Sequence, residues 1–396
     1  MNILFMDWKC FGREDLIVAF KELGHNLSYC SVIGHEFIVK FELDYIKEVK
    51  QQIKDDMIDV AFSMNYYPSV SEACKETGTP YIAWVYDNPF IQLYGINIIN
   101  DCNYIFTFNS YTRDMLQKKH VKTVSYAPLA TNTDRLDKFY LSRSDREKYG
   151  GEVSFVGSFY NEKDDYYGIL AEQLLKEDRR KTLGYIDGLM EAQLKIYGKT
   201  FLFRCLTDSI IKTIMEVYPY YKTYFTYFAD DPYIYAWVIG KKVTELERMG
   251  FLEALSYHVN VKVFTQIKGT VLGNCEVNGH VHYLNKAPNV YKGSKINLNI
   301  TLRTIETGIP FRAIEIMGCG GFMITNYQED FLLHFEPDKD FVFYESKEDL
   351  IEKCKFYLKH DTERQRIAKH AHDRVVSDHT FKKRLTEMLK IVFPDS

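Results

Sequence analysis

The chain has 396 residues, of which 46% are hydrophobic and 26% charged, and its formal net charge is −4. This composition excludes an extensively disordered chain, and the length favours two domains of roughly 150 to 200 residues. No cluster of Lys and Arg is dense enough to indicate a nucleic-acid partner. Eight scattered cysteines without a CxxC pair predict free thiols, and no apolar run approaches the length of a membrane span. We therefore expect a cytoplasmic protein without a transmembrane segment.

The first part of the chain alternates between apolar runs and segments with helical spacing. The apolar runs predict strands at Ile3–Met6, Leu27–Val32, Ile58–Ser63, Tyr81–Tyr86, Ile105–Asn109 and Val124–Tyr126. The predicted helices between them are Asp15–Leu23, Asp44–Asp55 and Val70–Thr77. Such alternation predicts a parallel sheet with helices on both faces, in which ligands bind beyond the carboxyl ends of the strands. Asp7, Trp8, Asp87 and Asn88 would then lie along one rim of the sheet.

A charged tract that ends at Gly150 and Gly151 interrupts this alternation. We therefore predict an α/β protein with two doubly wound, Rossmann-like domains, over 1–150 and 151–365. The strands predicted for the second domain are Val153–Val156, Val259–Phe264, Val281–Tyr283, Ile296–Ile300, Phe322–Thr325 and Phe341–Tyr344. Helical spacing over about 165–255 predicts an insertion in this domain. The amphipathic C-terminal helix, within about 375–396, is expected to pack back on the first domain.

The segment 295–326 contains the strongest candidate binding site. A strand leads into a polar loop, and a helix is predicted to start near Pro310, because proline is tolerated in a first helical turn. A helix N-terminus attracts a diphosphate, and Arg312 in that turn can bind phosphate oxygens in a bidentate manner. Glu315 lies on the same helical face and can accept both hydroxyls of a ribose. The alternative is that Arg312 is a solvated surface charge and Glu315 only complements the helix dipole.

The stretch Gly308–Gly321 resembles the donor-site signature of GT-B glycosyltransferases, especially the spore maturation protein CgeB family. Val153–Tyr160 (VSFVGSFY) is similar to the strand and loop that open the C-terminal domain of that family, and Tyr81–Pro89 (YIAWVYDNP) resembles its Trp-x-x-Asp-x-Pro segment. The resemblance covers about 81–160 and 258–390. It implies that 1–150 is an acceptor-side domain and 151–365 a nucleotide-sugar-binding domain, and that the two Rossmann-like domains face a cleft. It also implies sugar transfer from a nucleotide-diphosphate sugar.

The resemblance also implies which residues bind the donor. Glu315 would bind the ribose, and Arg312, Gly157 and Ser158 would contact the diphosphate. The full predicted donor set is Gly157, Ser158, Tyr160, Asn299, Thr301, Arg303, Gly308, Arg312 and Glu315. In many retaining GT-B enzymes two glutamates are one residue closer together than Glu306 and Glu315 are here, which leaves retaining or inverting stereochemistry open.

Proton transfer from the acceptor hydroxyl requires a carboxylate or an imidazole. Asp87, which follows a predicted buried strand and would face the interdomain cleft, is the first candidate, and Asp7 is the second. The alternative for Asp87 is that it only caps a turn before Asn88 and Pro89. No metal is predicted. The two pairs of neighbouring histidines, His280 with His282 and His370 with His372, lack a third and a fourth ligand at metal-binding spacing. The sugar nucleotide is a co-substrate, so no bound cofactor is expected.

Two other functions remain open at the level of sequence. A sugar-nucleotide epimerase can share this architecture and donor pocket, and would turn over the donor without an acceptor. A catalytically silent nucleotide or carbohydrate-binding module is the second alternative. The transferase hypothesis is preferred because Arg312, Glu315 and the Gly157–Ser158 loop occur together in the sequence. The sequence leaves the acceptor open among a glycan, a protein and a small molecule.

Overall fold

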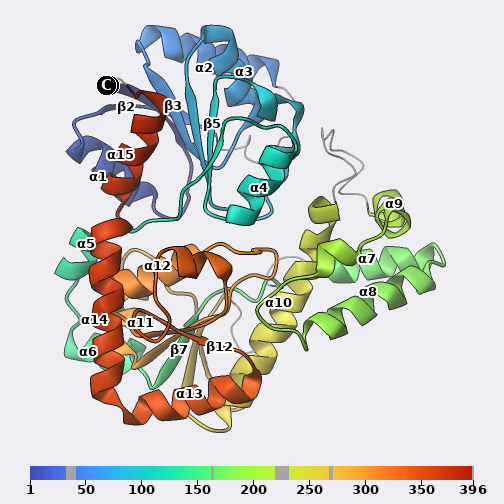
Figure 1. The fold of residues 1–396 in the computed structure, drawn as a ribbon, viewed down its shortest axis with the longest axis vertical. Helices are drawn as coiled ribbons and strands as arrows, with labels where there is room; N and C mark the ends of the chain where they lie inside the picture. Colours follow the sequence, from blue (N-terminus) through green and yellow to red (C-terminus); the bar gives the residue numbers. More distant parts are fainter. Residues whose placement is uncertain (33–41, 162–164, 219–231, 267–270, 395–396) are drawn as a thin grey trace. The chain divides into compact units, whose positions relative to one another are not determined.

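The computed structural model describes residues 1–32, 42–161, 165–218, 232–266 and 271–394, with side chains described for all of these except 232–236. The chain divides into two compact units, coloured along the sequence in Figure 1. Unit 1 includes Met1–Thr131 and His379–Ser396, and unit 2 includes Asn132–Lys222 and Tyr235–Asp378. The first boundary between the units lies at Thr131–Asn132, before the predicted domain boundary at residue 150. The predicted domain limits, 1–150 and 151–365, stay predictions.

Unit 1 is built on a parallel six-stranded sheet with the order β2-β1-β3-β4-β5-β6. Its strands are β1 (Asn2–Asp7), β2 (Asn26–Ser31), β3 (Val60–Met64), β4 (Tyr81–Val85), β5 (Asn103–Thr107) and β6 (Val124–Tyr126). Its helices are α1 (Arg13–Glu22), α2 (Leu43–Asp55), α3 (Pro68–Thr77), η1 (Ile91–Tyr94), η2 (Ile96–Ile99), α4 (Ser110–Lys118) and α15 (Phe381–Val392). Strands β3 and β4 are buried along their whole length, as expected for strands covered on both faces.

Unit 2 contains a second parallel six-stranded sheet, with the order β12-β11-β10-β7-β8-β9. Its strands are β7 (Val153–Val156), β8 (Val261–Phe264), β9 (Glu276–Asn278), β10 (Ile296–Asn299), β11 (Met323–Asn326) and β12 (Val342–Tyr344). Its helices are α5 (Thr133–Lys138), α6 (Arg143–Tyr149), α7 (Tyr166–Lys176), α8 (Arg180–Gln193), η3 (Leu202–Cys205), α9 (Asp208–Val217), α10 (Pro232–Ser256), α11 (Ala287–Gly293), α12 (Phe311–Gly318), η5 (Glu329–Leu333), α13 (Lys347–Lys359) and α14 (Asp361–Asp378).

The two faces of the unit 2 sheet carry separate apolar cores. One core joins the sheet to α10 and α13, through residues such as Leu252 and Leu350. The other joins it to α6, α11, α12 and α14, through residues such as Val290, Ile314 and Val375. Helices on both faces of a parallel sheet confirm the predicted doubly wound α/β architecture.

Three details differ from the sequence-based prediction. The edge strand β9 is Glu276–Asn278, whereas Val281–Tyr283 forms no strand, because that short apolar run instead leads into α11. Pro310 is the N-cap residue that precedes α12, with an extended backbone, so it lies just outside the first turn. The C-terminal helix predicted within about 375–396 is shorter than that range, because α14 extends to Asp378 and α15 is Phe381–Val392.

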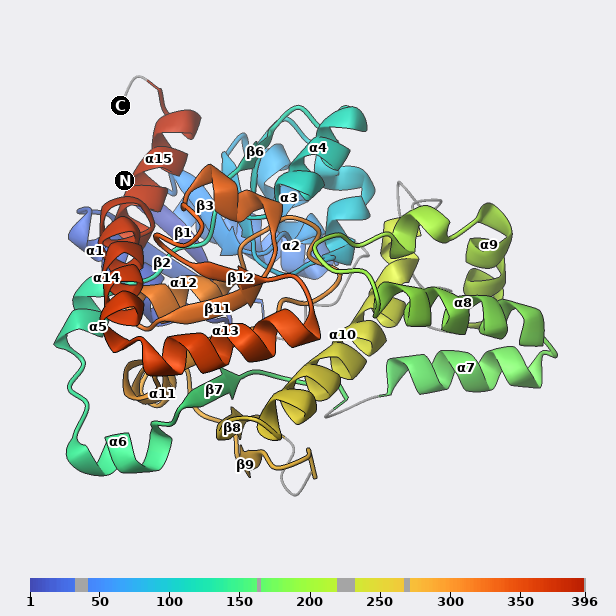
Figure 2. The same cartoon turned by 60° about the horizontal axis from the view of Figure 1, so that its bottom comes forward.

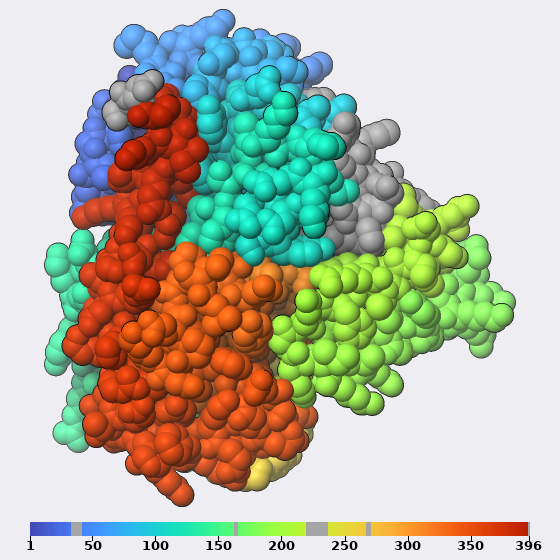
Figure 3. Space-filling model, viewed as in Figure 1, coloured from blue at the N-terminus to red at the C-terminus, as the bar shows by residue number. Residues whose placement is uncertain are grey.

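The predicted insertion at about 165–255 contains α7, α8, η3, α9 and most of α10, and its residues 219–231 lie outside the described residues. Figure 2 shows α7 and α8 side by side, and α10 running from them toward β8. In the space-filling view these helices form a lobe of unit 2 (Figure 3). Within the parts of the chain that the structure describes, no helix is long and apolar enough to cross a membrane.

Candidate active site

The carboxyl ends of β7, β10 and β11 bring most of the predicted donor residues together. These three strands are neighbours in the sheet, so the residues after them lie side by side. The side-chain nitrogen Nδ2 of Asn299, at the end of β10, donates to Thr301 Oγ1 at 3.0 Å and to Thr325 Oγ1 at 2.9 Å. The side-chain oxygen Oδ1 of Asn299 accepts a bond from Arg312 Nε at 3.0 Å. Asn299 and Thr301 therefore form a buried polar support for Arg312.

Arg312, in the first turn of α12, points back over the ends of the strands. Its Nη1 donates to the carbonyl oxygen of Val156 at 2.8 Å, and its Nη2 donates to that of Ile300 at 3.0 Å. Burial, and then the positive charge of Arg248, lower the pKa of Arg312 to about 10. A lowered pKa means that the protein does not fully compensate this charge. The solvated-surface alternative for Arg312 is therefore disfavoured.

Arg248, on α10, is a second buried cation beside Arg312 and was not among the residues predicted from the sequence. It is only 2% exposed, and it donates to the carbonyl oxygens of Ile300 and Ser158. The two guanidiniums lie over the ring of Phe155, with their central carbons 5.4 Å (Arg248) and 5.1 Å (Arg312) from its centroid. Among the side chains that the structure describes, no carboxylate forms an ion pair with either arginine. Two neighbouring buried cations without a counter-charge are costly, and they are typical of an anion-binding site.

The loop after β7 contributes backbone and close packing to this site. A side chain at Gly157 would collide with the Arg312 guanidinium and with Phe155, so glycine is required for this close approach. Ser158 Oγ accepts a bond from the amide of Tyr160 at 2.7 Å. The ring of Tyr160 lies 5.0 Å from the central carbon of Arg248. The loop thus holds the cations in place.

Arg303 and Gly308, also predicted to bind the donor, lie in the loop between β10 and α12. Arg303 is buried, and its guanidinium forms a two-point ion pair with Glu247 of α10, at 2.8 and 2.5 Å. Its side chain therefore ties the loop to α10. Gly308 is buried and precedes Pro310 at the start of α12. Donor binding by Arg303 and Gly308 stays a prediction.

Glu315 lies on α12 and is 2% exposed. Its Oε1 lies 3.7 Å from Nη2 of Arg135, on α5, whose Nη1 donates to the carbonyl oxygen of Leu284 at 3.2 Å. Glu315 thus faces the segment that connects β9 to α11. Its role as a ribose ligand stays a prediction.

Glu306 lies in the same loop as Arg303 and is an unusual carboxyl group. It is 8% exposed, and its Oε1 has no hydrogen-bond partner among the described residues. Burial raises the pKa of Glu306 to about 7, although Arg204 and Lys199 act in the opposite direction. This carboxyl group therefore titrates near neutral pH.

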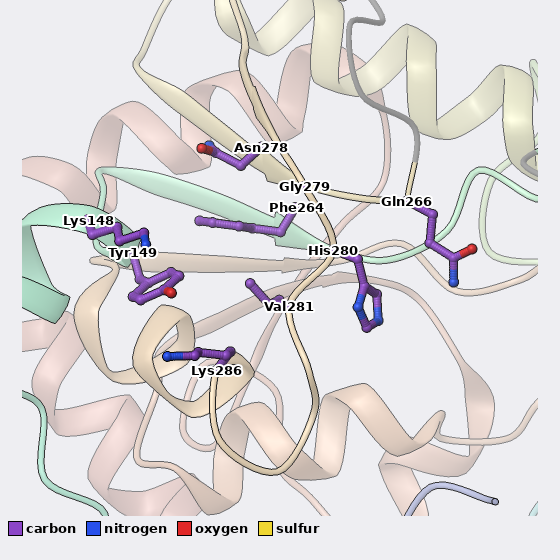
Figure 4. Close-up of a pocket in the computed structure, with 9 residues that line it drawn as sticks. All are labelled: Lys148, Tyr149, Phe264, Gln266, Asn278, Gly279, His280, Val281 and Lys286. Carbon is purple, nitrogen blue, oxygen red and sulfur yellow. The ribbon is translucent and has the colours of Figure 1, made fainter.

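A cavity of about 670 Å³ opens beside β8 and β9 in the same unit. Figure 4 shows its lining residues between β8 and α11: Lys148, Tyr149, Phe264, Gln266, Asn278, Gly279, His280, Val281 and Lys286. The rings of Tyr149 and Phe264 pack 6.2 Å apart, and Lys286 Nζ lies 5.7 Å from the Tyr149 ring. The cavity therefore offers aromatic surface with a polar, partly cationic rim, which suits a planar ligand with polar edges.

The two predicted catalytic carboxylates lie at the corresponding rim of unit 1. Asp87, after β4, is exposed, and its Oδ2 accepts a bond from Asn65 Nδ2 at 2.8 Å. The side-chain oxygen Oδ1 of Asn65 accepts bonds from the backbone amides of Tyr86 and Asp87 at 3.1 and 3.2 Å. Asn65, in a left-handed conformation (φ 66°), therefore fixes both the loop and the carboxylate of Asp87.

Asp7, at the end of β1, is held by a different partner. Both of its oxygens accept bonds from Arg13, at 2.5 and 2.7 Å. Arg13 therefore occupies both of the oxygens that would have to accept the proton of the acceptor hydroxyl. Asp87 therefore remains the better candidate for a general base. Across the described residues, no group of three or more His, Cys, Asp or Glu side chains could hold a metal ion.

The sequence signal for Arg248 lies in the spacing of α10. Arg248 is four residues after Thr244 and four before Leu252, and all three are buried. A cation on the apolar face of a helix is exceptional, because a buried charge needs a partner. The spacing puts Arg248 in line with Thr244 and Leu252, but only the structure shows that this line of residues is buried.

Comparisons with known proteins agree with this architecture. Residues 248–390 match the family model described as "Glycosyl transferase-like". No curated protein matches the chain. The narrower resemblance to the CgeB family stays a prediction.

Several solved structures resemble the chain along its whole length. A glycosyltransferase from Rickettsia africae is 13% identical, with a TM-score of 0.54 and coverage of 100% of this chain and 99% of that one. Sucrose-phosphate synthase from Thermosynechococcus elongatus is 9% identical, with a TM-score of 0.56 and coverage of 100% of both chains. The Anabaena protein HepE, solved with UDP-glucose, is 8% identical, with a TM-score of 0.55 and coverage of 99% of both chains. At these identities the likeness establishes the fold, and the family match supplies the activity. The chain is a glycosyltransferase of the GT-B fold, related through residues 248–390 to the glycosyl transferase-like family.

Proposed function

We propose that this enzyme transfers a sugar from a nucleoside-diphosphate sugar to an acceptor hydroxyl. The observation that carries the proposal is the pair of buried guanidiniums of Arg248 and Arg312, which no carboxylate of the described residues neutralises. They lie beside the N-terminus of α12, whose free amides also attract anions. A diphosphate would supply the missing negative charge.

The same charges suit the chemistry of transfer. The bond between the anomeric carbon and the donor phosphate oxygen breaks, and its electron pair goes to the diphosphate. The acceptor oxygen forms the new bond to that carbon and gives its proton to a base, for which we propose Asp87. Cations that already face the diphosphate stabilise the negative charge that develops on it. We propose that Arg248 and Arg312 fill the role that a metal ion has in other transferases, so that transfer is metal-independent.

The nucleoside would extend from the diphosphate along the sheet. Strands β7, β8 and β9 are consecutive neighbours, so the cavity beside β8 and β9 begins roughly 5 to 10 Å from the end of β7. This distance suits a nucleoside, with its ribose hydroxyls on Glu315 and its base near Phe264 and Tyr149 (Figure 4). The UDP-glucose bound by HepE makes a uridine nucleotide the first donor to test.

The test is calorimetric titration of UDP into the wild-type protein and into Arg248→Met and Arg312→Met. Each variant keeps an apolar stem but loses charge-assisted bonds, so UDP affinity should fall by about 10- to 100-fold. Arg180→Met on α8 is the matched control, because that arginine is 78% exposed, and its affinity should be unchanged. Unchanged UDP affinity in both site variants, with intact folding, would refute the donor assignment.

A cytoplasmic location stays a prediction from the sequence. Glycans, proteins and small molecules all remain open as acceptors.

A further inference from the structure

Helix α10 carries a third cation near the two donor arginines, which the proposed diphosphate site does not use. Lys241 is seven residues before Arg248, so the two side chains lie on the same face of the helix, about 10 Å apart along its axis. Both cations contact the ring of Tyr160, whose centroid is 5.0 Å from the central carbon of Arg248 and 5.8 Å from Lys241 Nζ. The row of cations therefore continues along α10 beyond Arg248.

Aromatic rings hold the ammonium group of Lys241 in place. Its Nζ is 4.5 Å from the ring centroid of Trp237 and 4.9 Å from that of Tyr166, and these two rings pack edge to face with centroids 5.0 Å apart. Tyr160 has a left-handed backbone (φ 65°), which is uncommon for an aromatic residue and typical of functional loops. A ring face attracts a cation without neutralising its charge. Lys241 is therefore a positioned positive charge, and its side chain is only partly buried.

The neighbour of Lys241 shows toward which strand this part of α10 lies. A Cβ atom at Gly240 would be 2.5 Å from Thr304 Cγ2, so glycine allows α10 to pack closely against the loop after β10. The cavity proposed for the nucleoside lies in the other direction along the sheet, beside β8 and β9 and beyond β7. A sugar nucleotide carries its nucleoside and its sugar at opposite ends of the diphosphate. The transferred sugar would thus lie toward Thr304 and Lys241.

We propose that Lys241 binds a carboxylate on the transferred sugar, so that the donor is a nucleoside-diphosphate uronic acid. The inference rests on the proposed function, because it names the class of donor sugar for the same site. The separation of Lys241 from Arg248 along α10, about 10 Å, leaves room for a sugar ring between the phosphates and the ammonium group. An ammonium group is a compact charge with three donors, which suits a carboxylate at C6 of the sugar.

The acids in the next turns of α10 do not oppose this assignment. Glu245 accepts bonds from Lys242 Nζ at 2.8 Å and from Asn161 Nδ2 at 2.7 Å. Glu247 forms the ion pair with Arg303. Because a cation offsets each of these charges, neither acid would strongly repel a carboxylate of the sugar. The alternative is that Lys241 only joins α10 to the loop after β7.

The experiment measures binding by calorimetry, without an acceptor, for two pairs of sugar nucleotides: UDP-glucuronate with UDP-glucose, and UDP-galacturonate with UDP-galactose. The members of each pair differ only at C6, so their affinity ratio reports the carboxylate alone. We expect the wild-type protein to bind the acidic member of at least one pair about tenfold more tightly, the scale of a charge-assisted hydrogen bond. Lys241→Met should lose this preference, and Lys241→Arg should keep most of it. Lys176→Met on α7 is the matched control, because that lysine is 59% exposed, and it should keep the wild-type preference.

UDP alone separates this inference from the proposed function. Its affinity for Lys241→Met should stay within about twofold of the wild-type value, since a charge roughly 10 Å from the phosphates is largely screened at about 0.15 M salt. If UDP did not bind the wild-type protein, the donor assignment would fail, and this inference with it. If UDP bound but the acidic sugars had no advantage, or if Lys241→Met kept the wild-type preference, the role of Lys241 would be overturned and the proposed function would stand.

Discussion

The two parallel sheets of this enzyme have the same construction and opposite chemistry at their carboxyl rims. In unit 1 the rim carries Asp7 and Asp87, and each carboxylate is held by a polar partner. In unit 2 the rim carries Arg248 and Arg312, whose partners are backbone carbonyls and aromatic faces. The sheets decide where a ligand binds, while the few residues after each strand decide the charge of that ligand. In the function that we propose, the basic rim would bind the donor diphosphate, and Asp87 of the acidic rim would take the proton of the acceptor hydroxyl.

The largest expected effect tests the acidic half of this comparison. Asp87→Asn keeps an oxygen that can accept the bond from Asn65, but it cannot take the acceptor proton. Turnover should therefore fall by about 10² to 10⁴, while UDP affinity barely changes. Steady-state rates with a working donor and acceptor, together with calorimetry, measure both quantities.

Asp7→Asn is the control for this prediction, because Arg13 already occupies the Asp7 carboxylate. It should lower stability more than turnover. If Asp87→Asn kept more than about a tenth of the wild-type rate, the loss would be smaller than removal of a general base causes. Asp87 would then be only a turn residue. A large rate loss in Asp7→Asn would then assign the base to Asp7.

The second prediction concerns an arginine of unit 2 whose role differs from that of Arg248 and Arg312. Arg303 is paired with Glu247 inside the protein, so Arg303→Met would leave a buried carboxylate without its cation. Stability should fall by about 3 to 5 kcal/mol in urea denaturation, with UDP affinity unchanged in the fraction that stays folded. Arg143→Met, which breaks a largely exposed ion pair with Glu147, should cost less than about 0.5 kcal/mol. A loss of UDP affinity without a loss of stability in Arg303→Met would move Arg303 into the donor site.

The sequence predicted the alternation of strands and helices, and with it the doubly wound fold, because buried parallel strands appear as continuous apolar runs. It also placed Asn299, Arg312 and Glu315 together, because they lie close to one another along the chain. The sequence analysis missed Arg248, which reaches the site from α10. The resemblance to the family does not cover that helix, so it did not point to Arg248. The ion pair of Arg303 with Glu247 was equally invisible, since pairing depends on three-dimensional packing. Residues that meet through the fold were the ones that the sequence could not bring together.

The third prediction uses Glu306, a buried acid of unit 2 whose Oε1 has no hydrogen-bond partner among the described residues. Burial raises its pKa from 4.5 to about 7 in the folded protein, so the folded state holds this proton more tightly than the unfolded state does. Stability should consequently fall as pH rises from 4.5 to about 7, with a total contribution of about 3 kcal/mol, and level off above that range.

Glu306→Gln removes this titration, so its urea midpoint should decline less than that of the wild-type protein between pH 5 and pH 8. Glu348→Gln, an exposed position at the start of α13, is the control and should follow the wild-type profile. Parallel profiles of urea midpoint against pH for the wild-type protein and Glu306→Gln would mean that the pKa of Glu306 is not raised in the folded protein. A cation or a hydrogen-bond donor would then stabilise its charged form.

The smallest expected effect asks whether the unit 2 site recognises a nucleoside in addition to phosphate. If Glu315 accepts the ribose hydroxyls, Glu315→Gln should weaken UDP binding by about 1 to 3 kcal/mol, the range for a charge-assisted hydrogen bond. A general loss of negative charge near the site could instead strengthen the binding of any anion, so a single affinity cannot separate the two effects.

A cycle of affinities, measured with UDP and with 2′-deoxy-UDP, does separate them. The wild-type protein should prefer UDP, and Glu315→Gln should lose most of that preference. The reason is that 2′-deoxy-UDP lacks the hydroxyl that would bond to Glu315, so the mutation weakens UDP binding more than 2′-deoxy-UDP binding. Arg312→Met is the control, since it should weaken both nucleotides equally and keep the preference. An undiminished preference for UDP in Glu315→Gln would leave Glu315 with a structural role, which includes its contact with Arg135. The basic rim would then bind the diphosphate without contacting the ribose hydroxyls.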